Sequence, residues 1–288
     1  MICGYLYGAM IGDIVGSIYE FSPIKTKAFP LFSESCEYTD DTIMTVAVAR
    51  AIMRDHECGD GVERQSLHQL MTQEMQFLGR RYPYPMGSYG NRFALWLRAD
   101  NPEPYNSYGN GSAMRASACG LAAQSLKEAL ELSRVSAEVS HNHPEGIKGA
   151  QATAAATFLA KTGKSKAEIK EYIEANFYSL NMSIDELNRT YGFEPSCQKS
   201  VPQAIVCFLQ SDSFEDAIRN TIYIGGDSDT IGAITGSIAY AFYLRAGMQS
   251  EGNVPEEIQR IVEEAKEKLP EEFIRTAEEF EEMFFQNT

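Results

Sequence analysis

The stretch "GYLYGAMIGDIVGSIYEF" (residues 4–21) carries a glycine at every fourth position from Gly4 to Gly16. On an α-helix these glycines would lie on one face and leave it almost free of side chains. A second helix could then approach that face closely, for steric reasons best documented in membranes. The string "GDIVGSIY" (12–19) is echoed by "GAITGSIAY" (232–240), so two such faces could pack together near the core.

Helical hydrophobic periodicity dominates the remaining sequence, whereas alternating strand-like runs are scarce. Regions 79–111 and 177–200, with their Pro, Gly and Asn clusters, are typical of loops. We therefore predict an all-α, compact multi-helix bundle forming one domain over residues 1–288. The expected helices span residues 41–54, 112–133, 146–161, 166–176, 200–210, 214–222, 229–246, 255–268 and 271–285.

The net charge of −15 argues against nucleic acid or an anionic membrane as the main partner, because both require basic surfaces. Much of the charge lies in the segment 251–288, where 12 Glu face 4 Lys and Arg, a net of −8. We predict an acidic helical tail there, with a solvated charged face.

The 6 cysteines show neither a C-x-x-C pair nor a framework spacing, which predicts reduced, partly buried thiols and favours a cytoplasmic protein. The N-terminus lacks a basic segment before its apolar run, so we expect no signal peptide. No apolar stretch is long enough to predict a membrane span.

Two short acidic clusters stand where apolar helices are expected to begin. "YTDDTIMT" (38–45) contains Asp40 and Asp41, and "IGGDSDTIGAITG" (224–236) contains Asp227 and Asp229. Acidic residues commonly cap helix N-termini, and that interpretation is sufficient for either cluster alone.

Each cluster nevertheless combines two carboxylates with a threonine hydroxyl, an all-oxygen set that suits hard divalent cations. If the clusters meet in space, two divalent ions would balance four mutually repelling carboxylates. A binuclear metal site is therefore one hypothesis for this pattern, and helix capping is the other.

Three further motifs have both ordinary and functional interpretations. Glu20 ends the glycine-rich stretch and could be an exposed helix-end charge. His141 and His143 in "SHNHPEG" could cap a helix or contact an anionic or sugar ligand, and they lack the partners for a zinc site. The loop "SYGNGSAMR" (107–115) leads into a helix as phosphate-binding loops do, although it lacks a Walker A lysine.

Together these motifs resemble the ADP-ribosylglycohydrolase family. The resemblance rests on "GAMIGDIVGSIYEF" (8–21), the two aspartate motifs, "GNGSAMR" (109–115) and "SHNHPEGIKGA" (140–150), in that order along the chain. It implies an all-α domain with two Mg²⁺ ions, or Mn²⁺, in a central cleft.

The resemblance also implies roles for individual residues. Glu20, Asp41 and Asp229 would be catalytic, and which of them is the general base stays open. The choice between His141 and His143 for ligand contact is also open, with His141 as the family's histidine. The metal ligands would be Thr39, Asp40, Asp41, Asp227, Asp229 and Thr230, and the substrate would contact Ser107, Tyr108, Gly109, Asn110, Ser112 and His141.

The implied reaction is the hydrolysis of an ADP-ribosylated protein or small molecule, with water attacking the distal ribose C1″ and ADP-ribose as product. The H-x-H-P form resembles the arginine-linked branch, so ADP-ribosyl-arginine is the expected substrate. Serine, a nucleic-acid base or a small metabolite are alternative acceptors. A metal-dependent ADP-ribose-binding protein without turnover is a second hypothesis, and a Ca²⁺-stabilised structural protein is a third.

Overall fold

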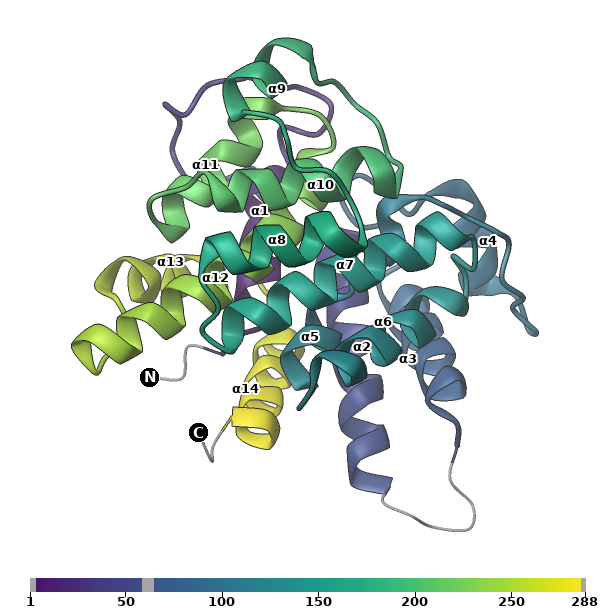
Figure 1. Ribbon diagram of the computed structural model, residues 1–288. Coiled ribbons are helices and arrows are strands. Elements are labelled where there is room, and N and C mark those ends of the chain that lie inside the picture. The colour runs from purple at the N-terminus through teal and green to yellow at the C-terminus, as the bar shows by residue number, and fades with distance from the viewer. Residues whose placement is uncertain (1–3, 59–64, 286–288) are drawn as a thin grey trace.

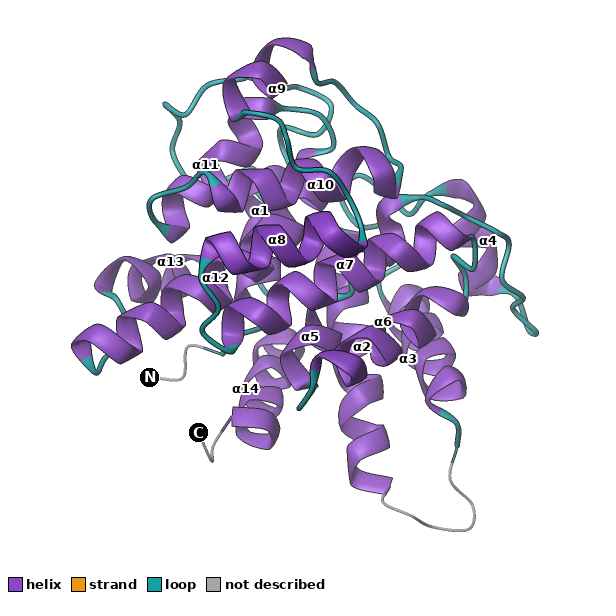
Figure 2. Ribbon diagram, in the orientation of Figure 1, coloured by secondary structure: helices purple, strands orange, loops and turns teal. Residues whose placement is uncertain are grey.

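The computed structural model describes residues 4–58 and 65–285, and within them the regular structure is helical, with no strand (Figure 2). The all-α prediction is confirmed. The helices are α1 (Tyr7–Gly16), α2 (Asp40–Cys58), α3 (Leu67–Arg81), α4 (Asn91–Arg98), η1 (Asn110–Ser112, a 3-10 turn), α5 (Ser117–Ala122), α6 (Leu126–Glu138), α7 (Pro144–Lys161), α8 (Lys166–Asn176), α9 (Ile184–Thr190), α10 (Cys197–Leu209), α11 (Phe214–Ile224), α12 (Ser228–Glu251), α13 (Glu256–Lys266) and α14 (Glu271–Phe285).

Helix α1 is the centre of the molecule, and each of its residues is buried. It runs antiparallel to α12, and the two glycine faces meet as the sequence suggested. A Cβ added to Gly12 would lie 1.9 Å from the Gly232 carbonyl oxygen, and one added to Gly8 would lie 2.6 Å from that of Gly236. Gly4 is the exception, because it precedes α1 and faces Ala277 of α14 instead.

The other helices pack around this central pair (Figure 1). Helices α7, α10 and α11 pack against α12, while α2 packs against α3, α5 and α14. In Figure 1 the helices α9, α10 and α11 gather at the top, and α2, α3 and α14 extend toward the bottom. The N-termini of α2 and α12 both lie close to α1, which brings distant parts of the chain together.

Three local predictions are wrong. The expected helix 112–133 is broken into η1, α5 and α6, because Ala123 is extended and Ser125 caps a new helix by accepting from the Glu128 N–H. The predicted loop 79–111 contains α4, and the loop 177–200 contains α9.

Helix α3 was not predicted, although its sequence carries a clear signal. A capping box joins Ser66 and Gln69, and the apolar residues that follow at helical spacing are buried. Helix α4 likewise buries Phe93, Trp96 and Leu97 at spacings of three and one. The prolines and glycines around α4 concealed that short helix, whereas α3, with 15 residues, was missed despite its signal.

The acidic C-terminal segment forms α13 and α14, which bury apolar faces, while glutamates such as Glu256, Glu263 and Glu279 are exposed. The five described cysteines are free, four of them buried, and Cys3 lies outside the described residues. No helix of the described chain combines the length and apolar character that a membrane crossing requires.

Candidate active site

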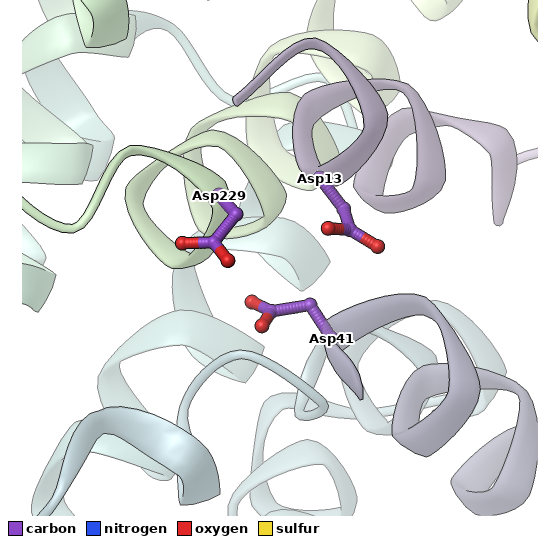
Figure 3. A group of neighbouring side chains, drawn as sticks. All are labelled: Asp13, Asp41 and Asp229. Atoms are coloured by element: carbon purple, nitrogen blue, oxygen red, sulfur yellow. The ribbon is translucent and has the colours of Figure 1, made fainter. Parts of the chain in front are cut away.

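The two aspartate clusters meet in one cavity of about 560 Å³. Carboxylate oxygens of Asp13, Asp41 and Asp229 lie within 4.8 Å of one another and point toward a common centre (Figure 3). A second group joins Glu20, Asp227 and Asp229 within the same limit. Asp229 belongs to both groups, so the acidic residues form one continuous cluster.

Helix α1 positions the start of α2 through Asp13, whose side chain is fully buried. Its carboxylate accepts hydrogen bonds from the Thr39 N–H (2.9 Å), the Thr39 hydroxyl (2.7 Å) and the Thr42 N–H (3.0 Å). These are free groups at a helix N-terminus, as the capping interpretation requires. The helix is capped by Asp13 and by the Thr39 hydroxyl, which accepts from the Asp41 N–H. The carboxylates of Asp40 and Asp41 are therefore not used as caps.

A glycine pair positions the second cluster. Gly225 and Gly226 have φ of 72° and 87°, which favours glycine, and they turn the chain from α11 into α12. Asp227 then accepts a hydrogen bond of 2.7 Å from the side-chain amide of Asn110, which also donates to the Ser200 hydroxyl. The loop before α5 therefore holds this carboxylate in place.

The electrostatics of the cluster are those of crowded, buried acids. Burial, followed by the charge of Asp13, raises the pKa of Asp41 and of Asp40 well above its usual range. Burial and the charge of Asp227 do the same to the pKa of Asp229. Burial, then Asp227 and Asp13, raises the pKa of Glu20 to about 7. The protein's own side chains do not neutralise the negative charge of this cluster, so a bound cation would reduce the repulsion between its carboxylates.

The donor set fits a hard divalent cation. Carboxylate and hydroxyl oxygens predominate, and softer ligands are absent from both groups. Asp41 Oδ1 is buried without a hydrogen-bond partner among the described residues, which is costly unless something else coordinates it. The hydroxyls of Thr39 and Thr230 each lie 3.4 Å from Asp41 Oδ2.

The structure thus brings the predicted residues of both motifs together. Asp40 lines the same cavity but does not belong to either tight group. Asp13 was not among the predicted site residues, yet its carboxylate belongs to one of the two groups. A carboxylate inside an otherwise apolar, glycine-rich helix was the available signal.

The predicted substrate loop is only partly exposed to the cavity. Ser107, Gly109 and Asn110 line it, whereas Tyr108 is 52% exposed and packs against His143. Ser112 is buried and donates to the Gly146 carbonyl.

The backbone N–H groups of this loop were expected to hold a diphosphate. Those of Gly109 and Asn110 already donate within the protein, to Ser107 Oγ and the Pro195 carbonyl. The loop is therefore preorganised, but two of its donors are already used.

Of the two histidines, His141 lines the cavity, while His143 caps α7 by accepting from the Glu145 N–H. Burial, followed by Arg115 and Arg92, holds the pKa of His141 well below its usual range, so the ring is neutral. Its Nδ1 lies 2.8 Å from Ser140 Oγ, which in turn accepts from Arg115. If that hydroxyl donates to Nδ1, the proton of the neutral ring is on Nε2, which faces Gly111.

Cationic and aromatic residues form another part of the cavity wall, and the sequence predicted no role for its arginines, although Arg115 ends the motif "GNGSAMR" (109–115). Arg92 lies over the Tyr105 ring at 4.7 Å, and Arg115 lies over Phe93 at 5.5 Å. Arg115 is fully buried, and its Nε and Nη1 have no hydrogen-bond partner among the described residues. The cavity is therefore polarised, with carboxylates in one region and guanidinium groups in another.

The structure is an all-α domain with a cavity in which carboxylates crowd together, an arrangement typical of hydrolases that act on sugar linkages. The comparisons give the family. The model of the ADP-ribosylglycohydrolase family matches residues 1–284, and the chain belongs to that family. It is a hydrolase of the ADP-ribosylhydrolase type.

Of two similar proteins, one is named an ADP-ribosylhydrolase and the other an ADP-ribosylarginine hydrolase. The chain is 29% identical to mouse ADP-ribosylhydrolase ARH3 over 329 residues, covering 90% of this chain and 86% of that protein. It is 25% identical to ADP-ribosylarginine hydrolase Tri1 of Pseudomonas putida (strain GB-1), covering 93% of this chain and 78% of that protein. A solved ADP-ribosylglycohydrolase-related protein complex shares the fold, with a TM-score of 0.68, 19% identity and coverage of 98% and 97%.

Proposed function

We propose that this protein hydrolyses the glycosidic bond at the distal ribose C1″ of ADP-ribosylated substrates, with ADP-ribosyl-arginine as the preferred linkage. The observation that carries the proposal is the polarised cavity. Carboxylates from three helices converge where a ribose and a developing positive charge would lie, and arginines line the wall where a diphosphate would lie.

Thr39, Asp40, Asp41, Asp227, Asp229 and Thr230 would hold two divalent cations, Mg²⁺ or Mn²⁺, with Asp13 orienting the Thr39 hydroxyl from behind. Such cations supply Lewis acidity and balance the charge of the cluster. The unpartnered Asp41 Oδ1 and the all-oxygen donor set support this assignment.

The protein's own carboxylates would manage the proton and the charge of the reaction. Asp41 or Asp229 would accept the proton of the attacking water, and their charges would stabilise an oxocarbenium-like ribose. Glu20, with its pKa raised to about 7 by burial and by Asp227, is suited to hold or release a proton at neutral pH. It would serve at the leaving-group side of the bond.

The remaining residues would bind and orient the ADP moiety. Neutral His141 would donate from Nε2 to a ligand oxygen, and Ser107, Gly109 and Asn110 would shape the wall beside it. Tyr105 lines the cavity under Arg92, so it is better placed than the exposed Tyr108 to stack on adenine. The free cysteines suit a reducing compartment, and we propose the cytoplasm.

A panel of defined ADP-ribosyl linkages to arginine, serine, a nucleic-acid base and a small metabolite tests the proposal. Release of ADP-ribose would be measured with Mg²⁺, with Mn²⁺ and with EDTA. We expect the fastest release from arginine and its loss in EDTA. Binding of ADP-ribose by calorimetry without release from any linkage would identify a binding protein instead, and release unaffected by EDTA would exclude the metal site.

A further inference from the structure

A pair of exposed aromatic rings lies at the edge of the cavity. Phe21 is 69% exposed and Phe193 is 52% exposed, yet their ring centroids are only 5.8 Å apart at an interplanar angle of 36°. Phe193 lines the cavity, and Phe21 directly follows Glu20, which also lines it. Two large apolar side chains exposed to solvent at the edge of a cavity are typical of a ligand-binding surface.

The charges around this pair indicate what kind of group it binds. Glu20 precedes one ring in the chain, and the exposed Glu194 follows the other. Glu20 also belongs to the group formed with Asp227 and Asp229. A ligand at the rings would therefore be close to several carboxylates, which favours a cation, and aromatic faces favour a flat cation that can stack.

Adenine is the main alternative occupant, because it is also flat. The arginines of the cavity, however, lie over Tyr105 and Phe93 and not over the Phe21–Phe193 pair. A diphosphate held near those arginines would direct adenine toward Tyr105. The ribose would then face the carboxylates, and the group beyond its C1″ would extend past Glu20 toward the rings.

We propose that Phe21 and Phe193 form an acceptor subsite that stacks the guanidinium of ADP-ribosyl-arginine and so selects this linkage. The inference rests on the proposed function, which it deepens by assigning the preference for arginine to named side chains. A serine-linked substrate has no planar cation at this place and would gain little from the pair.

Steady-state kinetics of Phe193→Ala test the subsite, with the exposed Phe77→Ala (51% exposed, on α3) as a matched control. Since a cation–π contact is worth about 1–2 kcal/mol when partly desolvated, we expect kcat/KM for ADP-ribosyl-arginine to fall roughly tenfold. Release from ADP-ribosyl-serine should change less than about twofold. Phe193→Tyr should restore the arginine rate, and Phe77→Ala should leave both unchanged.

Calorimetry with ADP-ribose, which has no acceptor, separates the subsite from its alternatives. Its affinity should be the same in Phe193→Ala and in the wild type. Weaker ADP-ribose binding would assign the rings to adenine and overturn the proposal, as would equal losses with both linkages or no loss with arginine. If the wild type releases ADP-ribose from neither linkage, the proposed function fails and the subsite with it.

Discussion

Asp41 shows how an individual residue can be placed for function at a cost to stability. Its side chain is only 2% exposed, it is surrounded by other acids, and one of its oxygens has no partner among the described residues. The Thr39 and Thr42 N–H groups at the start of the helix, which an acidic cap would accept from, donate to Asp13. The capping carboxylate and the carboxylate that we propose as reactive are thus different residues, which the sequence motif alone could not distinguish.

Replacing Asp229, the residue common to both carboxylate groups, should raise the stability of the metal-free protein and lower its activity. Asp229→Asn keeps the shape but removes one charge, so the metal-free protein should become more stable by about 1 kcal/mol. Hydrolysis should fall by at least about 100-fold, and the rise of melting temperature with Mg²⁺ should disappear. Melting curves with and without Mg²⁺, together with ADP-ribose release, measure both effects.

The exposed Asp100 gives the control for this substitution, because Asp100→Asn removes the same charge at a residue that does not line the cavity. It should retain the wild-type rate and the response to Mg²⁺. Unchanged turnover in Asp229→Asn would refute the assignment of this carboxylate to the site.

Asn110 is predicted to act on the metal site through Asp227. In Asn110→Ala the carboxylate loses its 2.7 Å hydrogen bond, and metal affinity should fall about 10- to 100-fold, as for other residues that orient a ligand. Titration of Mn²⁺ into the protein measures this affinity directly. Asn176→Ala, at an exposed asparagine of α8, should leave it unchanged.

At the scale of elements, the α1–α12 pair is the contact on which the site depends. Gly12→Ala would place a methyl group 1.9 Å from a backbone oxygen that cannot move away alone. We expect the helices to separate and the free energy of unfolding to fall by about 3 kcal/mol or more. Chemical denaturation measures the loss, with Gly90→Ala as control, because a Cβ there meets nothing within 4 Å.

A wild-type stability for Gly12→Ala would mean that the close approach is not required. Activity offers a second readout, since Asp13 follows Gly12 and holds the start of α2. Even a folded Gly12→Ala protein should therefore lose much of its activity, whereas Gly90→Ala should unfold at the same denaturant concentration as the wild type.

Most helices with regular apolar periodicity were predicted from the sequence, whereas α3, α4 and α9 were missed. Helix α8 was predicted at its observed residues because its apolar periodicity is regular and its ends carry caps. Helices α4 and α9 are short, and their stability comes from tertiary burial that local propensity does not reveal. The break between α5 and α6 depends on one extended alanine, which no composition signal marks.

The candidate site was predictable in the acidic residues of its two motifs, but not in Asp13 or in its cationic wall. Two Asp-x-Asp or Asp-Asp clusters with threonine are a local pattern that can be read from the chain. Arg92 belongs to no such pattern and Arg115 only ends the motif "GNGSAMR", and the fold brings both to the cavity that His141 lines, Arg92 on α4 and Arg115 in the turn before α5. Residues that act by tertiary proximity require the fold.

At the scale of the whole molecule, the acidic C-terminal helices pack against the rest of the fold and do not extend from it as a separate tail. Helix α14 packs against α2, and its Glu272 pairs with Arg81 and Arg50. Near the other end of the same helix, Glu281 accepts a 3.0 Å hydrogen bond from the Tyr5 N–H, and Phe285 stacks on the Tyr5 ring. The described ends of the chain are thus joined through a buried carboxylate.

This junction should make the stability of the protein depend on pH. Burial raises the pKa of Glu281 from 4.5 to about 7, opposed by the Tyr5 hydrogen bond. Between these values the folded state holds a proton that the unfolded state has released, so stability falls as pH rises through this range. Glu281→Gln stays neutral and can still accept from Tyr5, and it should gain up to about 3 kcal/mol relative to the wild type between pH 5 and 8.

Denaturation at several pH values measures the difference, in which contributions of the active-site acids cancel. The neighbouring exposed Glu282→Gln should show no such gain, and parallel curves for Glu281→Gln and wild type would mean that Glu281 is ionised in the folded protein throughout.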